Sequence, residues 1–177
     1  GFHLTITDAV DIEPDDLPEI EEELRSVLSC FSPEKTYLLE AGTRPASFWP
    51  TDKTQAALMF QPNALVLVLH TALVTLIQSR GRGSFYQVKM HARLSGYDAI
   101  RAQKIKLFLS PYIFDEFVPH FSLVRPYHGA NHSQLESQLN DFFRDSPRQI
   151  EIKSLCVVLQ QRPTDFFKIH HEIDLVT

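Results

Sequence analysis

The chain has 177 residues, a length that fits one domain or two closely packed lobes. Hydrophobic residues make up 44% of it, which is enough to bury a sizeable core. Its formal net charge of −5 at pH 7 argues against a protein that binds long nucleic acid regardless of sequence, but allows a short or small phosphorylated ligand.

The first half of the chain predicts helices and strands in alternation. A helix that begins at Asp15 or Asp16 carries glutamates in its first turns, where negative charge is favourable. A loop over residues 42–53 contains Trp49, the only tryptophan. The predicted elements are a strand at 2–10, this helix up to about residue 31, strands at 36–41 and 55–60, and an apolar helix at 63–79.

Strands dominate the second half. Residues 84–94 alternate between apolar and polar side chains, as a half-buried strand does. The predicted elements are strands at 84–94, 118–125, 149–160 and 165–175, helices at 97–109 and from 131 or 133 to 144, and a hairpin turn at 162–164. Mixed helices and hairpins predict an α+β fold with mostly antiparallel sheets. The order strand, helix, strand, strand occurs from residue 2 and again from residue 118, which indicates two lobes around a shared cleft.

The cysteines and the apolar helix bear on the compartment. Cys30 and Cys156 lack metal-ligand spacing and lie in apolar surroundings, so we interpret them as buried thiols of a cytoplasmic protein, with a disulfide as the alternative. Residues 63–78 are strongly apolar, but they contain His70 and are shorter than a membrane span. They therefore predict a buried helix, and no membrane partner is expected.

Two four-residue motifs share one pattern: His, apolar, hydroxyl, apolar. Residues 3–6 read His-Leu-Thr-Ile, and residues 120–123 read His-Phe-Ser-Leu. In a strand, alternate side chains lie on opposite faces, so each histidine shares a face with the hydroxyl that follows it, and the apolar residues pack on the other face. Two such strands side by side would place two imidazoles and two hydroxyls around one small volume, enough to bind a phosphate and to move protons.

These motifs, each followed by a helix and a pair of strands, resemble the two-histidine phosphoesterase superfamily, which includes 2′-5′ RNA ligase-like proteins and cyclic phosphodiesterases. Residues 112–123, Tyr-Ile-Phe-Asp-Glu-Phe-Val-Pro-His-Phe-Ser-Leu, look like the second motif of a bacterial branch associated with phosphonate metabolism, and residues 1–6, Gly-Phe-His-Leu-Thr-Ile, look like its first. The strand that usually precedes the first motif is absent, so we expect that it is missing from this sequence. The spacing between the motifs also exceeds that of the compact members.

The resemblance implies that residues 1–177 form a single bilobal domain, with two sheets around a central groove, helices on the outside, and neither a metal nor a cofactor. It implies that His3 and His120 are the general acid and base that hydrolyse a cyclic phosphate or 2′-5′ phosphodiester, and that Thr5 and Ser122 bind the phosphate oxygens. The expected ligand is a small phosphorylated molecule, a cyclic nucleotide or an RNA end. Which histidine is the base depends on which oxygen leaves, and both assignments stay open.

Other residues are candidates for binding. Lys89 and Arg93 lie on one polar strand face within a basic segment, residues 80–106, which is either a lip that attracts phosphate or a solvated surface balancing the acidic first helix. Tyr127 and Trp49 would stack on a nucleobase or, alternatively, pack in the core or anchor loops.

The remaining histidines favour structural roles. His70 is followed two places later by alanine, not a hydroxyl, and lies in an apolar helix, so we interpret it as a hydrogen-bonded core histidine. His170 and His171 are adjacent, so their rings lie on opposite strand faces, which argues against a zinc site. Two other classes of function stay open: a non-catalytic module that binds a nucleotide or an RNA end, and an interaction domain that lost the groove. The sequence makes no prediction about oligomeric state.

Overall fold

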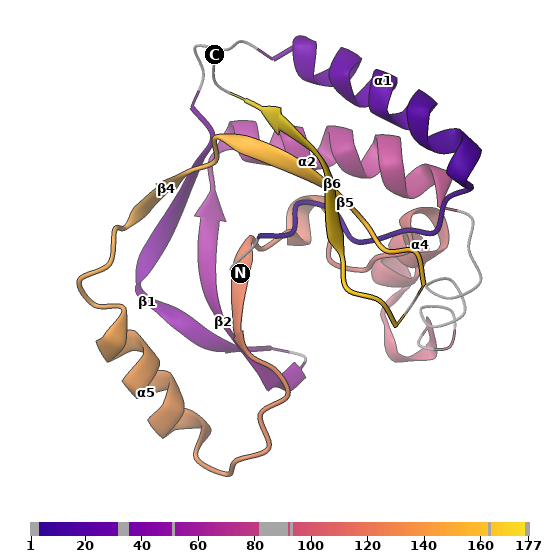
Figure 1. Cartoon of the computed structure of the whole chain (residues 1–177). Coiled ribbons are helices and arrows are strands. Elements are labelled where there is room, and N and C mark those ends of the chain that lie inside the picture. The colour runs from indigo at the N-terminus through magenta and orange to yellow at the C-terminus, as the bar shows by residue number, and fades with distance from the viewer. Residues whose placement is uncertain are drawn as a thin grey trace.

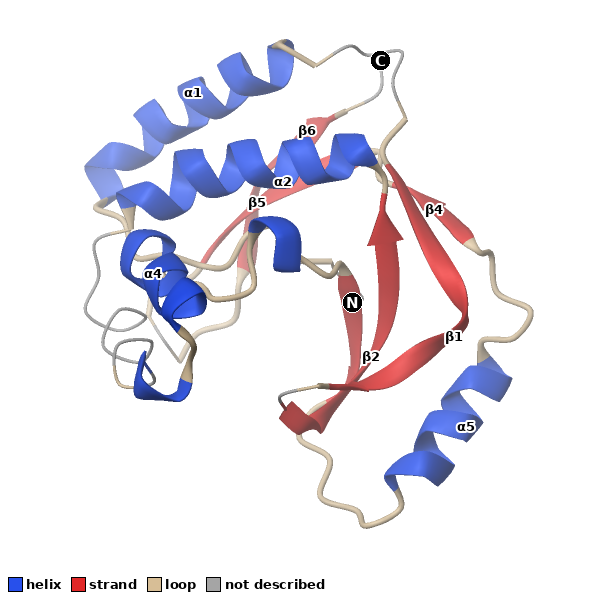
Figure 2. Ribbon diagram, turned by 180° about the vertical axis from the view of Figure 1, so that it is seen from behind, coloured by secondary structure: helices blue, strands red, loops and turns tan. Residues whose placement is uncertain are grey.

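The computed structural model describes residues 4–31, 36–50, 52–81, 92, 94–162 and 164–175. Over these residues the chain has the predicted α+β fold, with two antiparallel sheets (Figures 1 and 2). The α-helices are α1 (Leu17–Ser29), α2 (Ala64–Ile77), α4 (Ala99–Phe108) and α5 (His132–Phe142). The strands are β1 (Leu38–Trp49), β2 (Asp52–Pro62), β3 (His120–Val124), β4 (Gln149–Glu151), β5 (Ser154–Leu159) and β6 (Lys168–Asp174). Short 3-10 turns are η1 (Pro14–Asp16), η2 (Gln78–Arg80), η3 (Leu94–Gly96) and η4 (Phe114–Glu116).

The larger sheet combines strands from both halves of the chain. Its strand order is β3-β2-β1-β4, and every neighbouring pair is antiparallel. The order of elements that occurs from residue 2 and again from residue 118 predicted two lobes. The strands do not pair within two such lobes, because β1 and β2 join the sheet that holds the second motif. The predicted strand over 149–160 is divided between β4 and β5, which belong to different sheets. The predicted hairpin at its end is confirmed as the antiparallel pair β5-β6.

Helices α1 and α2 lie side by side across one end of the larger sheet (Figures 1 and 2). The amphipathic stripe of α1 buries Ile20 and Leu24, as its spacing predicts. Asn63 caps the N-terminus of α2, and its side chain accepts a hydrogen bond from the Val66 N–H (3.0 Å). The main core joins α1, α2, β1, β2 and β5 through Leu24, Tyr37, Leu39, Phe60, Val66, Leu69, Leu73 and Leu155.

The prediction of a loop over residues 42–53 is wrong for most of that segment. Strand β1 continues to Trp49, with a shift of register between Ala41 and Ala46 that absorbs Gly42 and Pro45. Beyond the bulge, the side chain of Asn140 from α5 replaces a neighbouring strand. Its Oδ1 accepts from the Ala46 N–H (3.0 Å) and its Nδ2 donates to the Ala46 carbonyl (2.8 Å). Trp49 is thereby part of the sheet.

The prediction of buried cysteines is also wrong. Cys30 and Cys156 are free thiols, as interpreted, and do not form the alternative disulfide, but both are exposed. Cys30 follows the last residue of α1, outside its apolar stripe. Cys156 follows the buried Leu155 on β5, and strand alternation turns its side chain outward. No helix among the described residues is both long and apolar enough to cross a membrane.

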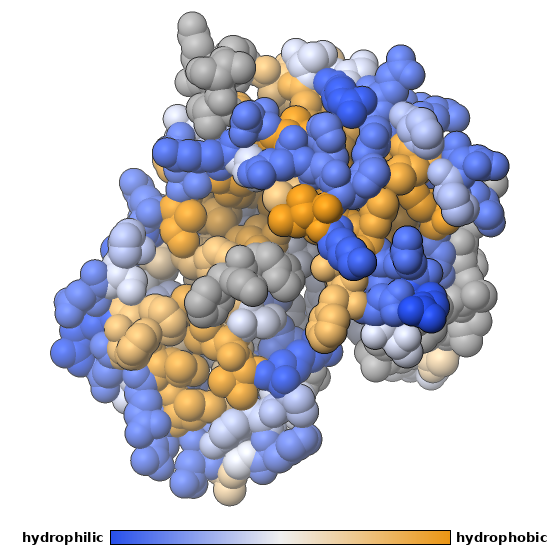
Figure 3. All heavy atoms as spheres, in the orientation of Figure 1, coloured by the Kyte–Doolittle hydropathy of each residue, from blue (hydrophilic) through white to orange (hydrophobic). Residues whose placement is uncertain are grey.

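The larger sheet has an apolar hollow of about 190 Å³ on its Phe121 face, and apolar side chains gather there in the space-filling view (Figure 3). The hollow is lined mainly by Ala41, Pro45, Leu58, Phe60, Phe121, Phe143, Pro147 and Ile150. By alternation along β3, His120 and Ser122 lie on the opposite face. The chemistry-bearing side chains and the apolar hollow are therefore separated by the thickness of one sheet.

Candidate active site

The second motif lies on β3, the edge strand of the larger sheet. His120 is paired with Met59 of β2, and Ser122 with Ala57. Phe121 lies between them on the other face, where its ring meets that of Phe60 edge-on, with centroids 5.5 Å apart. The predicted alternation is therefore confirmed here: histidine and serine share one face, and the aromatic side chain packs on the other.

The hydrogen bonds of His120 define which of its nitrogens carries a proton. Nδ1 lies 2.9 Å from the Val118 carbonyl oxygen, which can only accept, so Nδ1 is protonated. Nε2 lies 3.3 Å from the amide nitrogen of Gln55, which can only donate. In this arrangement the imidazole is neutral, and its Nε2 lone pair faces a donor. A neutral imidazole that carries a lone pair on Nε2 can act as a base.

Gln55 is a site residue that the sequence analysis missed. Its side-chain nitrogen donates to Ser122 Oγ (3.0 Å) as well as facing His120 Nε2, so one amide orients both motif side chains. Gln55 is buried, with 7% of its surface exposed. A buried polar side chain requires partners, and here the partners are the motif residues themselves. The only signal in the sequence was a glutamine at the start of the otherwise apolar strand predicted over 55–60.

An aromatic wall, formed by Trp49, Tyr112 and Tyr97, stands beside His120. The Trp49 ring lies 4.7 Å from the imidazole, and Tyr112 meets Trp49 edge-on at 5.9 Å. Tyr97 meets Tyr112 edge-on at 6.4 Å. The Arg101 guanidinium lies over the Tyr112 ring, 5.7 Å from its centroid. Strand β1 brings Trp49 into this wall, so the extension of β1 to Trp49 matters for the site.

Ion pairs hold Arg101, the cation that lies over the Tyr112 ring of the aromatic wall. Arg101 Nε donates to Glu116 (3.0 Å) and its guanidinium lies 3.4 Å from Asp98, the N-cap residue of α4. The hydrogen bond that Arg101 donates to Glu116 raises the pKa of Arg101, so its guanidinium stays charged. Lys104 donates to Asp115 (2.7 Å) and to the Ile113 carbonyl (3.2 Å). Together these contacts fasten the segment that leads into β3 against α4.

The first motif is only partly described, because His3 lies outside the described residues. The prediction of a strand over 2–10 is wrong for its described part: residues 4–10 contain no strand. Instead of joining a ladder, the Ile6 carbonyl accepts a hydrogen bond from His70 Nδ1 (2.6 Å). The inward and outward pattern is nevertheless as predicted. Leu4 and Ile6 pack against the main core, and Thr5 between them is exposed.

The predicted binding residues have different outcomes. Lys89 and Arg93 lie outside the described residues, as does most of the predicted strand over 84–94. Tyr127 is half-buried, and its ring packs against Phe48 (5.4 Å) and His132 (5.1 Å). Its backbone N–H donates to the Thr54 carbonyl, next to Gln55. These contacts of Tyr127 therefore favour the alternative of loop anchoring.

The basic segment also favours its structural alternative where it is described. Three of its cations are paired with acidic side chains: Arg80 with Glu23 (2.5 Å), Arg101 with Glu116, and Lys104 with Asp115.

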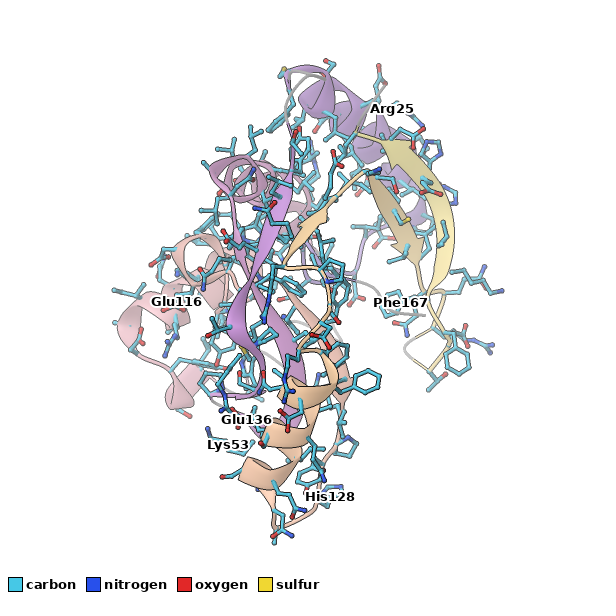
Figure 4. All side chains as sticks on the ribbon, turned by 90° about the vertical axis from the view of Figure 1, so that its left-hand side faces the viewer. Arg25, Lys53, Glu116, His128, Glu136 and Phe167 are labelled. Carbon is cyan, nitrogen blue, oxygen red and sulfur yellow. The ribbon has the colours of Figure 1, made fainter. Side chains whose placement is uncertain are left out.

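The described residues contain no group of three or more histidine, cysteine or acidic side chains placed to hold a metal ion. Figure 4 shows His128 in the segment before α5, apart from Glu116.

Comparison with known proteins gives one match. Residues 89–168, a little under half of the chain, match the model of a family described as "Protein of unknown function (DUF1045)". The matched segment contains α4, η4, β3 and α5, and thus His120 and Ser122. No curated protein matches the chain, and no solved structure does. The family description names no activity, so the resemblance to two-histidine phosphoesterases stays a prediction.

Proposed function

We propose that the protein is a metal-independent phosphodiesterase that hydrolyses a cyclic phosphate or a 2′-5′ phosphodiester on a nucleotide, a ribose or an RNA end. The observation that supports this most is the hydrogen bonding of His120. The Val118 carbonyl holds the proton on Nδ1, and the buried Gln55 amide contacts both Nε2 and the neighbouring Ser122 hydroxyl. A neutral imidazole held beside a hydroxyl is suited to accept a proton from water next to a bound phosphate.

In the proposed reaction His120 is the base. Its Nε2 takes a proton from water, the water oxygen bonds to phosphorus, and the bond from phosphorus to the departing ribose oxygen breaks. His3, protonated beforehand, gives its proton to that oxygen, and both imidazoles then exchange a proton with solvent to regain their starting states. Ser122 and Thr5 donate hydrogen bonds to the non-bridging oxygens, where negative charge grows in the transition state. The roles of His3 and Thr5 rest on the resemblance.

The aromatic wall supports a substrate that carries a flat group. Trp49 lies beside His120, and Tyr112 lies beside Trp49, so we expect a group attached to a phosphate at Ser122 to meet this wall. Aromatic side chains stack on nucleobases without requiring a particular base. Among the possible substrates, the wall therefore favours a nucleotide or an RNA end over a bare ribose phosphate. The free cysteines agree with the proposed cytoplasmic location, because a reducing compartment keeps thiols unpaired.

A turnover assay tests the proposed function. The panel consists of 2′,3′-cyclic nucleotides, ADP-ribose 1″,2″-cyclic phosphate and 2′-5′-linked oligoadenylate, all in EDTA, with the His120→Ala variant as the blank. We expect turnover of at least one nucleotide substrate by the wild-type protein and none by the variant. Turnover that disappears in EDTA and returns with added metal would reject the proposed mechanism. Saturable binding that depends on His120 without any turnover would replace the enzyme by the alternative, a nucleotide- or RNA-end-binding module.

A further inference from the structure

His70 is a fully buried histidine in the middle of the apolar helix α2, with 1% of its surface exposed. Both of its ring nitrogens are hydrogen-bonded, as the sequence analysis expected of a core histidine. Nδ1 lies 2.6 Å from the Ile6 carbonyl oxygen, and Nε2 accepts a hydrogen bond from the Phe114 N–H (3.0 Å). Its ring stacks on that of Phe117, with centroids 3.8 Å apart and planes 7° from parallel.

The partners of His70 belong to the two motif segments. Ile6 directly follows Thr5, the hydroxyl residue of the first motif. Phe114 and Phe117 belong to the segment that ends at Pro119 and enters β3 at His120. One imidazole thus connects the backbone of the first motif with the approach to the second.

The bridge requires a neutral imidazole. The Ile6 carbonyl can only accept, so Nδ1 must carry a proton, and the Phe114 N–H can only donate, so Nε2 must not. A second proton on the ring would place two donors, Nε2–H and the Phe114 N–H, against each other in a buried position. Protonation therefore removes one of the two hydrogen bonds and leaves a buried N–H without its acceptor.

Phe114 is held in an unusual backbone conformation. Its φ of 59° lies in the left-handed region, which bulky residues rarely adopt. Such conformations persist only where the surroundings fix them, and they occur often at functional sites. Here the surroundings are the bond to His70 and the contacts of Lys104 with Ile113 and Asp115 on either side. Loss of the bond to His70 would remove one of the restraints that keep this segment in place.

We propose that His70 is a positioning residue that holds the two motif segments in their working arrangement, and that protonation of its ring releases them. This rests on the proposed function, because it assigns the two segments to one active site. His70 contacts no reacting atom in this scheme and acts through the positions of Thr5 and His120. The consequence is a loss of activity at acidic pH that comes from a residue outside the catalytic pair.

The sign of the pH dependence follows from the surroundings of the ring. Burial lowers the pKa of His70, and the Ile6 carbonyl and the charge of Asp8 offset part of that effect. The acids of η4, Asp115 and Glu116, are paired with Lys104 and Arg101. Because the folded-state pKa is lowered, the contribution of neutral His70 to stability is complete above the ordinary imidazole pKa of about 6.5. It is lost as the pH falls through the lower folded-state value.

Two variants and a matched control test the proposal. His70→Phe keeps a flat ring to stack on Phe117 but loses both hydrogen bonds, and His70→Gln restores a donor and an acceptor on a flexible chain. Val74→Ala is the control, because Val74 is buried on the same helix and its truncation destabilises the core without removing a side-chain hydrogen bond to either motif segment. For each protein, kcat and KM are measured on the best cyclic nucleotide of the panel, and hydrogen exchange is followed at residues 4–8 and 112–118 by NMR.

We expect His70→Phe to lower kcat by about 10- to 100-fold with KM changed little, because the reacting groups are displaced by a fraction of an ångström while binding contacts remain. His70→Gln should recover part of that loss. The Phe114 amide should exchange faster in His70→Phe, and in the wild-type protein it should lose protection as the pH falls through the lowered pKa of His70. Val74→Ala should alter neither kcat nor the protection of Phe114 relative to the rest of the core.

Equal losses of kcat in His70→Phe and Val74→Ala at equal losses of stability would overturn the positioning role. An unchanged Phe114 amide on acidification of the wild-type protein would overturn the release by protonation, and this measurement needs no variant to fold. If the wild-type protein turns over no member of the panel while Phe114 responds as expected, the proposed function fails and the bridge between the two segments stands.

Discussion

The two motif segments have the same pattern of residue types but different backbone structures. The second motif is a strand, paired with β2 at His120, Phe121 and Ser122 and, after a shift of register, at Val124. The described part of the first motif, from Leu4 onward, forms no strand, and its Ile6 carbonyl is bonded to a side chain. Both nevertheless send apolar residues into the core and leave the hydroxyl residue exposed. Residue patterning thus determines which side chains face inward, and a ladder forms only where a second strand supplies hydrogen bonds.

The difference also shows how each segment is held. Strand β3 is fixed by backbone pairing, and one buried side chain, Gln55, adjusts His120 and Ser122 on it. The first motif depends on the packing of Leu4 and Ile6 and on one imidazole, that of His70. A segment held by a few side chains is easier to displace than one held by a ladder. The four predictions that follow test whether two segments held so differently serve one site.

The largest expected effect comes from removing either histidine of the motifs. His120→Ala and His3→Ala should each lower kcat by about 10²- to 10⁴-fold, the usual contribution of a positioned acid or base. Steady-state kinetics on the best panel substrate measures the loss, and circular dichroism checks the fold. His128→Ala is the matched control, because His128 is exposed and belongs to neither motif. Full activity in His3→Ala would mean that the first motif takes no part in catalysis.

Substitutions of the two hydroxyl residues, one in each motif, compare the two segments most directly. Ser122→Ala and Thr5→Ala should each lower kcat by about 10²-fold, because each removes one donor to the developing charge. Equal effects would indicate that the segment without a strand places its hydroxyl as well as the ladder does. If Ser122→Ala loses activity and Thr5→Ala is fully active, the hydroxyl of Thr5 faces solvent and does not bind the phosphate. The double variant should lose less than the sum if both hydroxyls bind the same phosphate.

Substitutions of Gln55 should have a smaller effect on kcat and should shift the pH–rate profile in a defined direction. Gln55→Leu removes the amide that orients His120 and Ser122, and we expect kcat to fall about tenfold through loss of orientation. Gln55→Glu places a carboxylate against Nε2, which favours the protonated imidazole. A base must be unprotonated to act, so the acidic limb of the pH–rate profile should move to higher pH in this variant. A shift to lower pH would contradict the assignment of His120 as the base.

Much of the fold could be predicted from the sequence, because it depends on local signals. The amphipathic spacing of α1, the apolar run of α2 and the alternation around His120 each report the immediate surroundings of the chain. The continuation of β1 to Trp49 could not, because Gly42 and Pro45 are signals for a loop, and the strand resumes only with help from Asn140, ninety-four positions beyond Ala46. Gln55 was missed for the same reason: its role appears only when β2 and β3 are paired.

Asn140 provides the smallest expected effect on the site and a second case of backbone held by a side chain. Its amide satisfies both the N–H and the carbonyl of Ala46, much as His70 satisfies Ile6. Asn140→Ala should therefore cost about 1–3 kcal/mol of the free energy of unfolding, measured by urea denaturation, because two partly buried backbone groups lose their partners. Asn131→Ala is the matched control, since the Asn131 side chain makes no capping hydrogen bond, and it should change stability little. Because β2 holds the end of β1 from its other side, with Trp49 paired to Asp52, Asn140→Ala should leave kcat within about twofold of the wild-type value. A large loss of kcat would instead mean that the wall beside His120 depends on this one amide, as the first motif is proposed to depend on His70.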